Sequence, residues 1–126
     1  MKIDNRKPRK MTLKEVKKIL QCEVIVGEDN LDIEISSVGG SDLMSDVLAF
    51  GKPGMLLLTG LTNAQSVRTA DIIEGKAIIY VRGKKPSKEG IELAKNKGIP
   101  LLSTNYMMFE ACGLLYSQGL SGVNES

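Results

Sequence analysis

Hydrophobic residues beyond residue 54 come in short uninterrupted runs, and each run is followed by a segment in which they recur at helical spacing. A short, fully apolar run is typical of a strand that helices cover on both faces. Because strands and helices alternate, the strands must pair in parallel, with each helix returning the chain to the same end of the sheet. The sequence therefore predicts strands over residues 55–59, 77–81 and 99–102, each followed by a helix, over about 63–74, 87–97 and 105–117.

The first third of the chain carries one clear helix start and two weaker strand signals. Thr12 and Glu15 match a capping box, in which each side chain bonds the backbone of the other residue. Apolar residues then recur at helical spacing over residues 13–20, so we expect a short amphipathic helix there. Strands are expected over residues 23–26 and 32–37, with a polar turn between them.

These elements fit one domain with three layers. We expect an α/β fold, a three-layer α/β/α sandwich with a mostly parallel central sheet, over residues 12–120. Residues 1–11 are basic and contain Pro8 and few apolar groups, so they predict a disordered leader. Residues 121–126 are expected to form a frayed tail. A chain of 126 residues with 42% hydrophobic positions is long enough to bury a core of this kind.

A glycine pair, Gly39 and Gly40, opens a polar segment that leads into a further helical pattern. We interpret the pair as a tight bend or a positive φ angle, with Ser41 or Asp42 capping the helix that follows. The segment lacks the glycine spacing and the lysine of a phosphate-binding P-loop. Asp42 and Asp46 share a helix face, but two carboxylates rarely complete a cation site. The sequence therefore assigns the two glycines and the two aspartates to a structural junction.

Small polar residues follow each of the three predicted parallel strands. Open parallel sheets usually bind ligands at the carboxyl ends of their strands, where these loops should meet. Taken singly, each loop is most often an ordinary cap or turn. Together they predict a shallow pocket for a small anionic or nucleotide-like ligand, in which hydroxyls, an amide and one positive charge are available. The candidate ligand-binding residues are Thr59, Gly60, Thr62, Asn63, Arg82, Ser103 and Thr104.

The composition removes several classes of chemistry. Histidine is absent, which excludes histidine-dependent triads and histidine-based metal sites. Cys22 and Cys112 are too few and too far apart for a stapled scaffold or a paired-cysteine zinc site, so we expect reduced, largely buried thiols. The remaining lysines and carboxylates form no recognisable reacting set, and we expect no enzyme, cofactor or metal site. No run approaches the ~20 apolar residues of a spanning helix, so we expect a cytoplasmic protein without membrane contact.

Charge is distributed unevenly along the chain. Residues 1–18 hold eight Lys and Arg against two acidic residues, whereas residues 19–126 hold nine against thirteen. A basic arm can bind nucleic acid, but such sites normally include base-stacking groups, and the aromatic residues of this chain lie outside the arm. We favour a solvated helix face and expect no nucleic-acid partner. The competing interpretation predicts steep salt dependence and loss of binding when the arm is deleted.

Five segments spread over the folded part carry a resemblance to a known family, namely residues 38–40, 42–49, 53–54, 98–104 and 109–116. On these motifs the chain from about Thr12 to Leu120 resembles the stand-alone DRTGG domains, which are akin to the amino-terminal domain of HPr kinase/phosphorylase. The resemblance implies a three-layer α/β fold and self-association, which we expect as a homodimer. It also implies a sensing or scaffolding task in a prokaryotic cytosol, with a regulated enzyme as partner, and it brings no catalytic residues.

Two functions compete on this sequence. The leading hypothesis is a non-catalytic regulatory domain that self-associates and binds a small anionic ligand at the strand ends. The alternative is a purely structural interaction module without a ligand, whose partner contacts the face of Asp42 and Asp46 or the last helix. That helix carries an apolar stripe, which we assign first to the core and second to a subunit contact: Phe109, Cys112, Leu115 and Tyr116.

Overall fold

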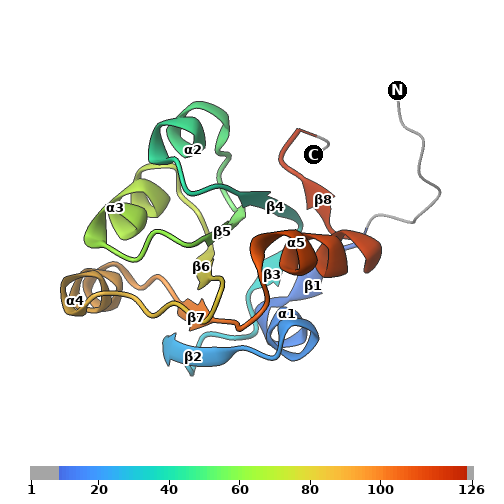
Figure 1. The fold of residues 1–126 in the computed structure, drawn as a ribbon, viewed down its shortest axis with the longest axis horizontal. Coiled ribbons are helices and arrows are strands. Elements are labelled where there is room, and N and C mark those ends of the chain that lie inside the picture. Colours follow the sequence, from blue (N-terminus) through green and yellow to red (C-terminus); the bar gives the residue numbers. More distant parts are fainter. Residues whose placement is uncertain (1–8, 125–126) are drawn as a thin grey trace.

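The computed structural model describes residues 9–124 and shows a six-stranded sheet between two layers of helices (Figure 1). The order of strands is β2 (Glu23–Val26), β7 (Leu101–Ser103), β6 (Ala77–Tyr80), β5 (Leu56–Thr59), β4 (Ser37–Gly40) and β8 (Ser121–Gly122). Neighbouring strands pair in parallel except at one edge, where β2 runs antiparallel to β7. A separate antiparallel pair joins β1 (Met11–Thr12) to β3 (Glu34–Ile35). The predicted α/β/α sandwich with a mostly parallel sheet is confirmed.

The helices divide between the two faces of the sheet (Figure 1). One face is covered by α1 (Leu13–Leu20) and α5 (Met108–Ser117), and the other by α2 (Met44–Phe50), α3 (Ala64–Ile72) and α4 (Lys88–Lys97). Each of the parallel strands β5 and β6 is followed by a helix that returns the chain to the opposite end of the sheet. The polar loops that follow these strands therefore lie at one end of the molecule.

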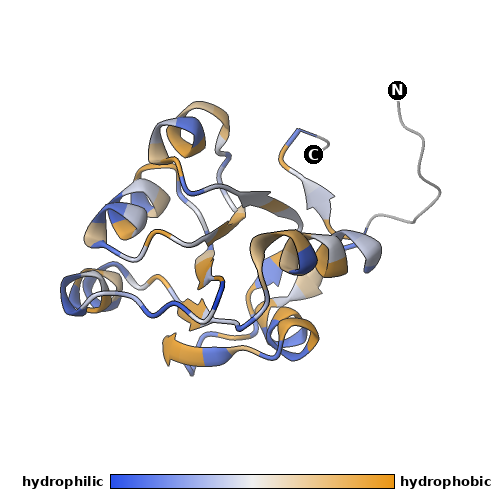
Figure 2. Cartoon of the chain, in the orientation of Figure 1, coloured by the Kyte–Doolittle hydropathy of each residue, from blue (hydrophilic) through white to orange (hydrophobic). Residues whose placement is uncertain are grey.

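The central strands are buried on both faces, which explains their unbroken hydrophobic sequence. Leu56 and Leu58 of β5 join the hydrophobic cluster beneath α1 and α5, whereas Leu57 joins the cluster beneath the other three helices. Successive side chains of a strand point to opposite faces, so one strand contributes to both clusters. Figure 2 shows hydrophobic residues along the sheet and hydrophilic residues on the outer turns of α3 and α4.

The N-terminal part of the fold begins slightly before its predicted start. The capping box is confirmed: the Glu15 N–H donates to Thr12 Oγ1 at 3.2 Å, and the Thr12 N–H donates to Glu15 Oε1 at 3.0 Å. Met11 is buried in β1, and Arg9 Nε donates to the backbone oxygen of Gln118 at 2.8 Å. Both residues were assigned to the leader, of which residues 1–8 lie outside the described part of the chain.

The C-terminal segment adds a strand where the sequence predicted fraying. Ser121 and Gly122 form β8, which pairs in parallel with β4. Val123 is buried against the cluster beneath α2. Residues 125–126 lie outside the described part of the chain.

The glycine pair lies inside β4, so the predicted bend is wrong. Neither glycine has a positive φ angle. Glycine is needed at these two positions because neighbouring side chains leave no room for a Cβ atom. A Cβ on Gly39 would lie 2.6 Å from Met55 Cε, and a Cβ on Gly40 would lie 3.0 Å from Cys112 Sγ and Met108 Sδ. Glycine at these positions therefore lets side chains from both layers pack directly on the backbone of β4.

Two of the later helices begin close to their predicted starts, and one begins later. Asn63 Oδ1 accepts the N–H of Gln65 at 3.1 Å at the start of α3, and Ser87 Oγ accepts the N–H of Gly90 at 3.1 Å at the start of α4. The last helix was expected from about residue 105, but α5 begins at Met108. The preceding residues instead form a loop whose backbone and side chains bond to neighbouring segments.

Candidate functional site

Loops from three strands meet at the carboxyl ends of β4, β5 and β6, and the carboxylate of Asp42 lies at their meeting point. Asp42 Oδ1 accepts hydrogen bonds from the Gly60 N–H at 2.6 Å and from the Thr59 hydroxyl at 3.3 Å. Asp42 Oδ2 lies 3.4 Å from Nη1 of Arg82. Donors from the β5 and β6 loops thus converge on a single carboxylate from the β4 loop.

The predicted cap of α2 is wrong, because neither Ser41 nor Asp42 caps this helix. The N-cap residue is Leu43, without a side-chain cap hydrogen bond. Ser41 extends the pairing of β4 instead, since its N–H donates to the Leu58 carbonyl at 3.0 Å and its Oγ accepts the Leu43 N–H at 3.0 Å. The Asp42 side chain turns toward β5, where it finds donors that include a charged guanidinium.

Arg82 is held in an unusual backbone conformation that directs its side chain across the site. Its φ angle is 61°, in the left-handed region that non-glycine residues rarely occupy. The Arg82 N–H donates to the Tyr106 carbonyl and the Gly83 N–H to the Thr104 carbonyl, each at 2.8 Å. The guanidinium lies so close to the backbone of Gly60 that a Cβ there would overlap it. The loop after β7 therefore fixes the turn from which Arg82 reaches β5.

The site is open to solvent above a buried floor. The side chains of Arg82 and Asp42 are 36% and 49% exposed, whereas Thr59 is fully buried. An exposed ion pair of this kind contributes at most ~1 kcal/mol to stability. This arrangement can hold an anion. The guanidinium of Arg82, the backbone N–H of Gly60 and the hydroxyl of Thr59 all point toward one position.

Of the seven predicted ligand residues, three lie together around Asp42 and four serve neighbouring structure. Thr59, Gly60 and Arg82 are the three. The hydroxyls of Ser103 and Thr104 donate at 2.6 Å to the carbonyls of Lys84 and Leu20. Asn63 caps the start of α3. The backbone carbonyl of Thr62 accepts the N–H of Ser87, just before α4.

Sequence reasoning placed Asp42 in a structural junction and did not include it among the ligand residues. The partners of its carboxylate lie 17, 18 and 40 residues further along the chain, so no local pattern reveals them. Asp46, its companion in that prediction, lies exposed on α2. The available signal was topological: an acidic residue that directly follows a strand of the parallel sheet lies at its carboxyl end.

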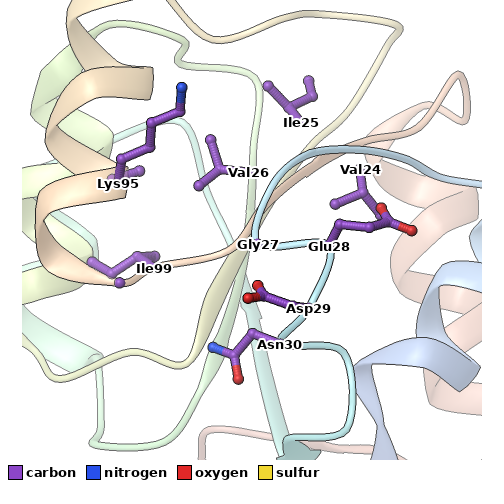
Figure 3. A pocket seen from close by; sticks show the side chains of 11 residues that line it. Val24, Ile25, Val26, Gly27, Glu28, Asp29, Asn30, Lys95 and Ile99 are labelled. Atoms are coloured by element: carbon purple, nitrogen blue, oxygen red, sulfur yellow. The ribbon is translucent and has the colours of Figure 1, made fainter.

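A hollow of about 550 Å³ lies at the opposite end of the sheet, between the β2–β3 turn and the end of α4 (Figure 3). Glu28, Asp29 and Asn30 line it from the turn, while Lys95 and Ile99 line it from the opposite side. Its wall also includes apolar side chains of β2. Charges of both signs and apolar groups are mixed there, whereas ligand sites usually place a few polar groups so that they converge.

Helix α5 exposes apolar side chains beside a groove of about 390 Å³. Phe109 is 84% exposed, Met107 at the helix start is 55% exposed, and Tyr116 is 41% exposed. The assignment of Phe109 and Tyr116 to the core is therefore wrong, although Leu115 of the same stripe is buried. The apolar stripe of α5 is wider than the face of this helix that packs on the sheet. Ala111 and Leu115 lie on the packed face and are buried.

Three further observations concern the thiols, the metal-binding groups and the lengths of the helices. Burial raises the pKa of the Cys22 thiol to about 12 and also raises the pKa of Cys112, so both thiols are protonated at neutral pH. Within residues 9–124, no group of three or more acidic or cysteine side chains is placed to hold a metal ion. No helix in this part of the chain is long and apolar enough to cross a membrane.

A similar structure is the regulatory region of a Clostridium perfringens pyrophosphatase, composed of CBS and DRTGG domains and complexed with its activator, diadenosine tetraphosphate. The two structures share 23% sequence identity and a TM-score of 0.71, over 90% of this chain and 49% of that chain. This chain thus spans about half the length of that region. At this identity the similarity shows the fold. No family model matches the sequence, and no curated protein matches it.

Proposed function

We propose that this chain is a non-catalytic regulatory domain of the DRTGG type that binds a small anionic, nucleotide-like ligand at the carboxyl ends of its strands. The observation that carries the proposal is the convergence of the Gly60 N–H, the Thr59 hydroxyl and the Arg82 guanidinium on one carboxylate. A phosphate group also offers negatively charged acceptor oxygens, with more charge than a carboxylate, and arginine recognises phosphate and carboxylate alike.

The fold supports a regulatory role for this site. The similar structure is a regulatory region, and the activator in that complex, diadenosine tetraphosphate, is a polyanionic nucleotide. We propose that this chain likewise responds to a phosphorylated small molecule and passes the response to an enzyme in the cytosol. The pyrophosphatase regulatory region also contains CBS domains. We therefore propose that the regulated partner of this chain is a protein that binds it or a further domain joined to it.

The test is a titration with sodium pyrophosphate and, separately, with ADP at constant ionic strength, followed by calorimetry. Arg82→Ala should weaken binding tenfold or more, because a hydrogen bond to a charged group contributes ~1.5–3 kcal/mol. Arg68→Ala is the matched control, since Arg68 is also partly exposed and also pairs with a carboxylate, that of Glu89 on α4. Equal weakening by the two variants, or no heat of binding at millimolar concentrations, would refute the site.

The second candidate function is an interaction module, and the exposed apolar surface of α5 favours it. Phe109 and Tyr116 flank the groove between α5 and the β4–β8 edge of the sheet, and an exposed aromatic beside an apolar groove is typical of a protein interface. We propose that this surface joins two copies of the chain. Phe109→Lys should shift a dimer to monomer in sedimentation equilibrium, whereas Ile72→Lys, at a 65% exposed position on α3, should not.

A further inference from the structure

The proposed anion site is already occupied by part of the protein itself. All three donors that would serve a bound phosphate are directed at the carboxylate of Asp42, and the shortest of these contacts is the 2.6 Å bond from the Gly60 N–H. A phosphate cannot share the Gly60 N–H with this carboxylate. Two anions held side by side would also repel each other, because like charges in close contact interact unfavourably at a protein surface.

From these contacts we infer that Asp42 is an internal competitor for the anion site, and that a phosphate-bearing ligand binds by displacing its carboxylate. The inference rests on the proposed function, since it describes how that same site is regulated. In the free state the Asp42 carboxylate neutralises Arg82 and satisfies Gly60. In the bound state the ligand takes over both partners, and Asp42 turns into solvent, where half of its side chain already lies.

The chain around Asp42 is built so that a displacement stays local. On the amino side, Ser41 is anchored by its backbone bond to Leu58. On the carboxyl side, Met44 and Val47 anchor α2 in the core, with 7% and 0% exposure. Only Asp42 and Leu43 lie between these anchors, and Leu43 is 57% exposed. The backbone of Leu43 is also held, since its N–H donates to Ser41 Oγ and its carbonyl accepts the N–H groups of Asp46 and Val47. A rotation about the side-chain torsions of Asp42 can therefore release the carboxylate while β4 and α2 stay in place.

Displacement gives the domain two states that a ligand distinguishes. A ligand shifts a conformational equilibrium only when it binds one state better than the other, and here it binds only the state in which Asp42 has left. The surface that changes is that of the Asp42 side chain, which lies beside the exposed Leu43 at the start of α2. This surface is thus where a regulated partner would detect occupancy.

The experiment compares pyrophosphate binding to the wild-type chain, Asp42→Asn and Asp46→Asn by calorimetry at constant ionic strength. Asn at position 42 keeps the size of the side chain but removes the charge that holds it to Arg82, so the Kd should fall at least tenfold. Asp46→Asn changes the net charge equally, a turn further along on α2, and should alter the Kd less than twofold. Binding to Asp42→Asn that is equal to or weaker than wild type overturns the displacement.

A third variant separates this inference from the proposed function. If Arg82→Ala abolishes binding while Asp42→Asn leaves the wild-type Kd unchanged, the anion site stands and the displacement is wrong. If none of the proteins binds pyrophosphate, the anion site is wrong and the displacement falls with it. Asp42→Ala repeats the test with a smaller side chain, and thermal unfolding of each variant confirms that the compared proteins are folded.

Discussion

The two ends of the central sheet differ in what they offer a ligand. The amino end of β7 borders a hollow of about 550 Å³, whose wall mixes opposite charges with apolar groups. The carboxyl ends of β5 and β6 carry a partly exposed site, where the backbone and side-chain donors of two loops converge on Asp42. The cavity volume favours the amino end of β7 as a ligand site, whereas the convergent donors favour the carboxyl ends of β5 and β6. For a small charged ligand, the convergence of donors is the stronger indication.

One glycine at each end of the sheet shows the same difference between a structural role and a role in the candidate site. Gly27 beside the hollow has a φ angle of 92°, and a Cβ there would lie 3.0 Å from the Pro100 Cα. Gly60 at the carboxyl end has no positive φ angle, and a Cβ there would meet the guanidinium of Arg82, the far end of a flexible side chain. The first glycine serves the fold, because backbone cannot yield, and the second serves the placement of Arg82.

The largest effect is expected from Gly27→Ala. This substitution should lower the free energy of unfolding by ~2 kcal/mol or more, because it adds a backbone contact to the ~1–2 kcal/mol cost of a left-handed residue. Gly54→Ala is the control: Gly54 has a φ angle of 87° but nothing within 4 Å of its Cβ position. Urea unfolding measures both variants. Equal losses would show that the contact with Pro100 contributes nothing.

Gly60→Ala should give the opposite pattern. We expect a loss of stability of ~1 kcal/mol or less, because Arg82 can swing away and only an exposed ion pair is broken. Pyrophosphate affinity should nevertheless fall about tenfold, since the guanidinium loses its position over β5. Urea unfolding measures the change in stability, and calorimetry of the same preparation measures the change in pyrophosphate affinity. A large loss of stability with unchanged affinity would reverse the roles assigned to the two ends.

The smallest effect concerns pH and the thiol of Cys22, which lies just before β2, near the carboxyl end of β7. Burial raises its pKa from 9.0 to about 12 in the folded protein. The unfolded chain therefore ionises first, and stability should be level below about pH 9 and decline as the pH rises from 9 toward 12.

Cys22→Ala should flatten that decline between pH 8 and 10, as measured by the midpoint of thermal unfolding at each pH. Burial also raises the pKa of the Tyr80 phenol above its ordinary value of 10.0, so the comparison stays below the range where this phenol contributes most. Identical slopes for wild type and variant would show that the Cys22 thiol is not protected by the fold.

The sequence predicted the sheet well because its central strands carry their own signal. The continuous apolar runs of β5 and β6 require burial on both faces, and that requirement leaves few arrangements other than helices on either side. The capping box at Thr12 was equally local, since both partners lie within four residues. Each of these features depends on neighbours in the sequence, and each was found.

The features that sequence reasoning missed depend on distant partners. Gly39 and Gly40 were taken for a bend, but Met55 and Cys112 set their need for space. Phe109 follows a helical period that continues past the edge of the covered face, so periodicity alone assigned it to the core. Asp42 was read as part of a junction because its donors come from loops after other strands.

The most direct measurement of the central claim is an amide NMR titration of the wild-type chain with pyrophosphate. If the donors at the carboxyl ends form the anion site, the amide signals of Gly60 and Leu43 should move first and saturate together, while the signal of Gly27 at the other end stays in place. Shifts that gather at residues 24–30 and leave Gly60 unmoved would contradict the account.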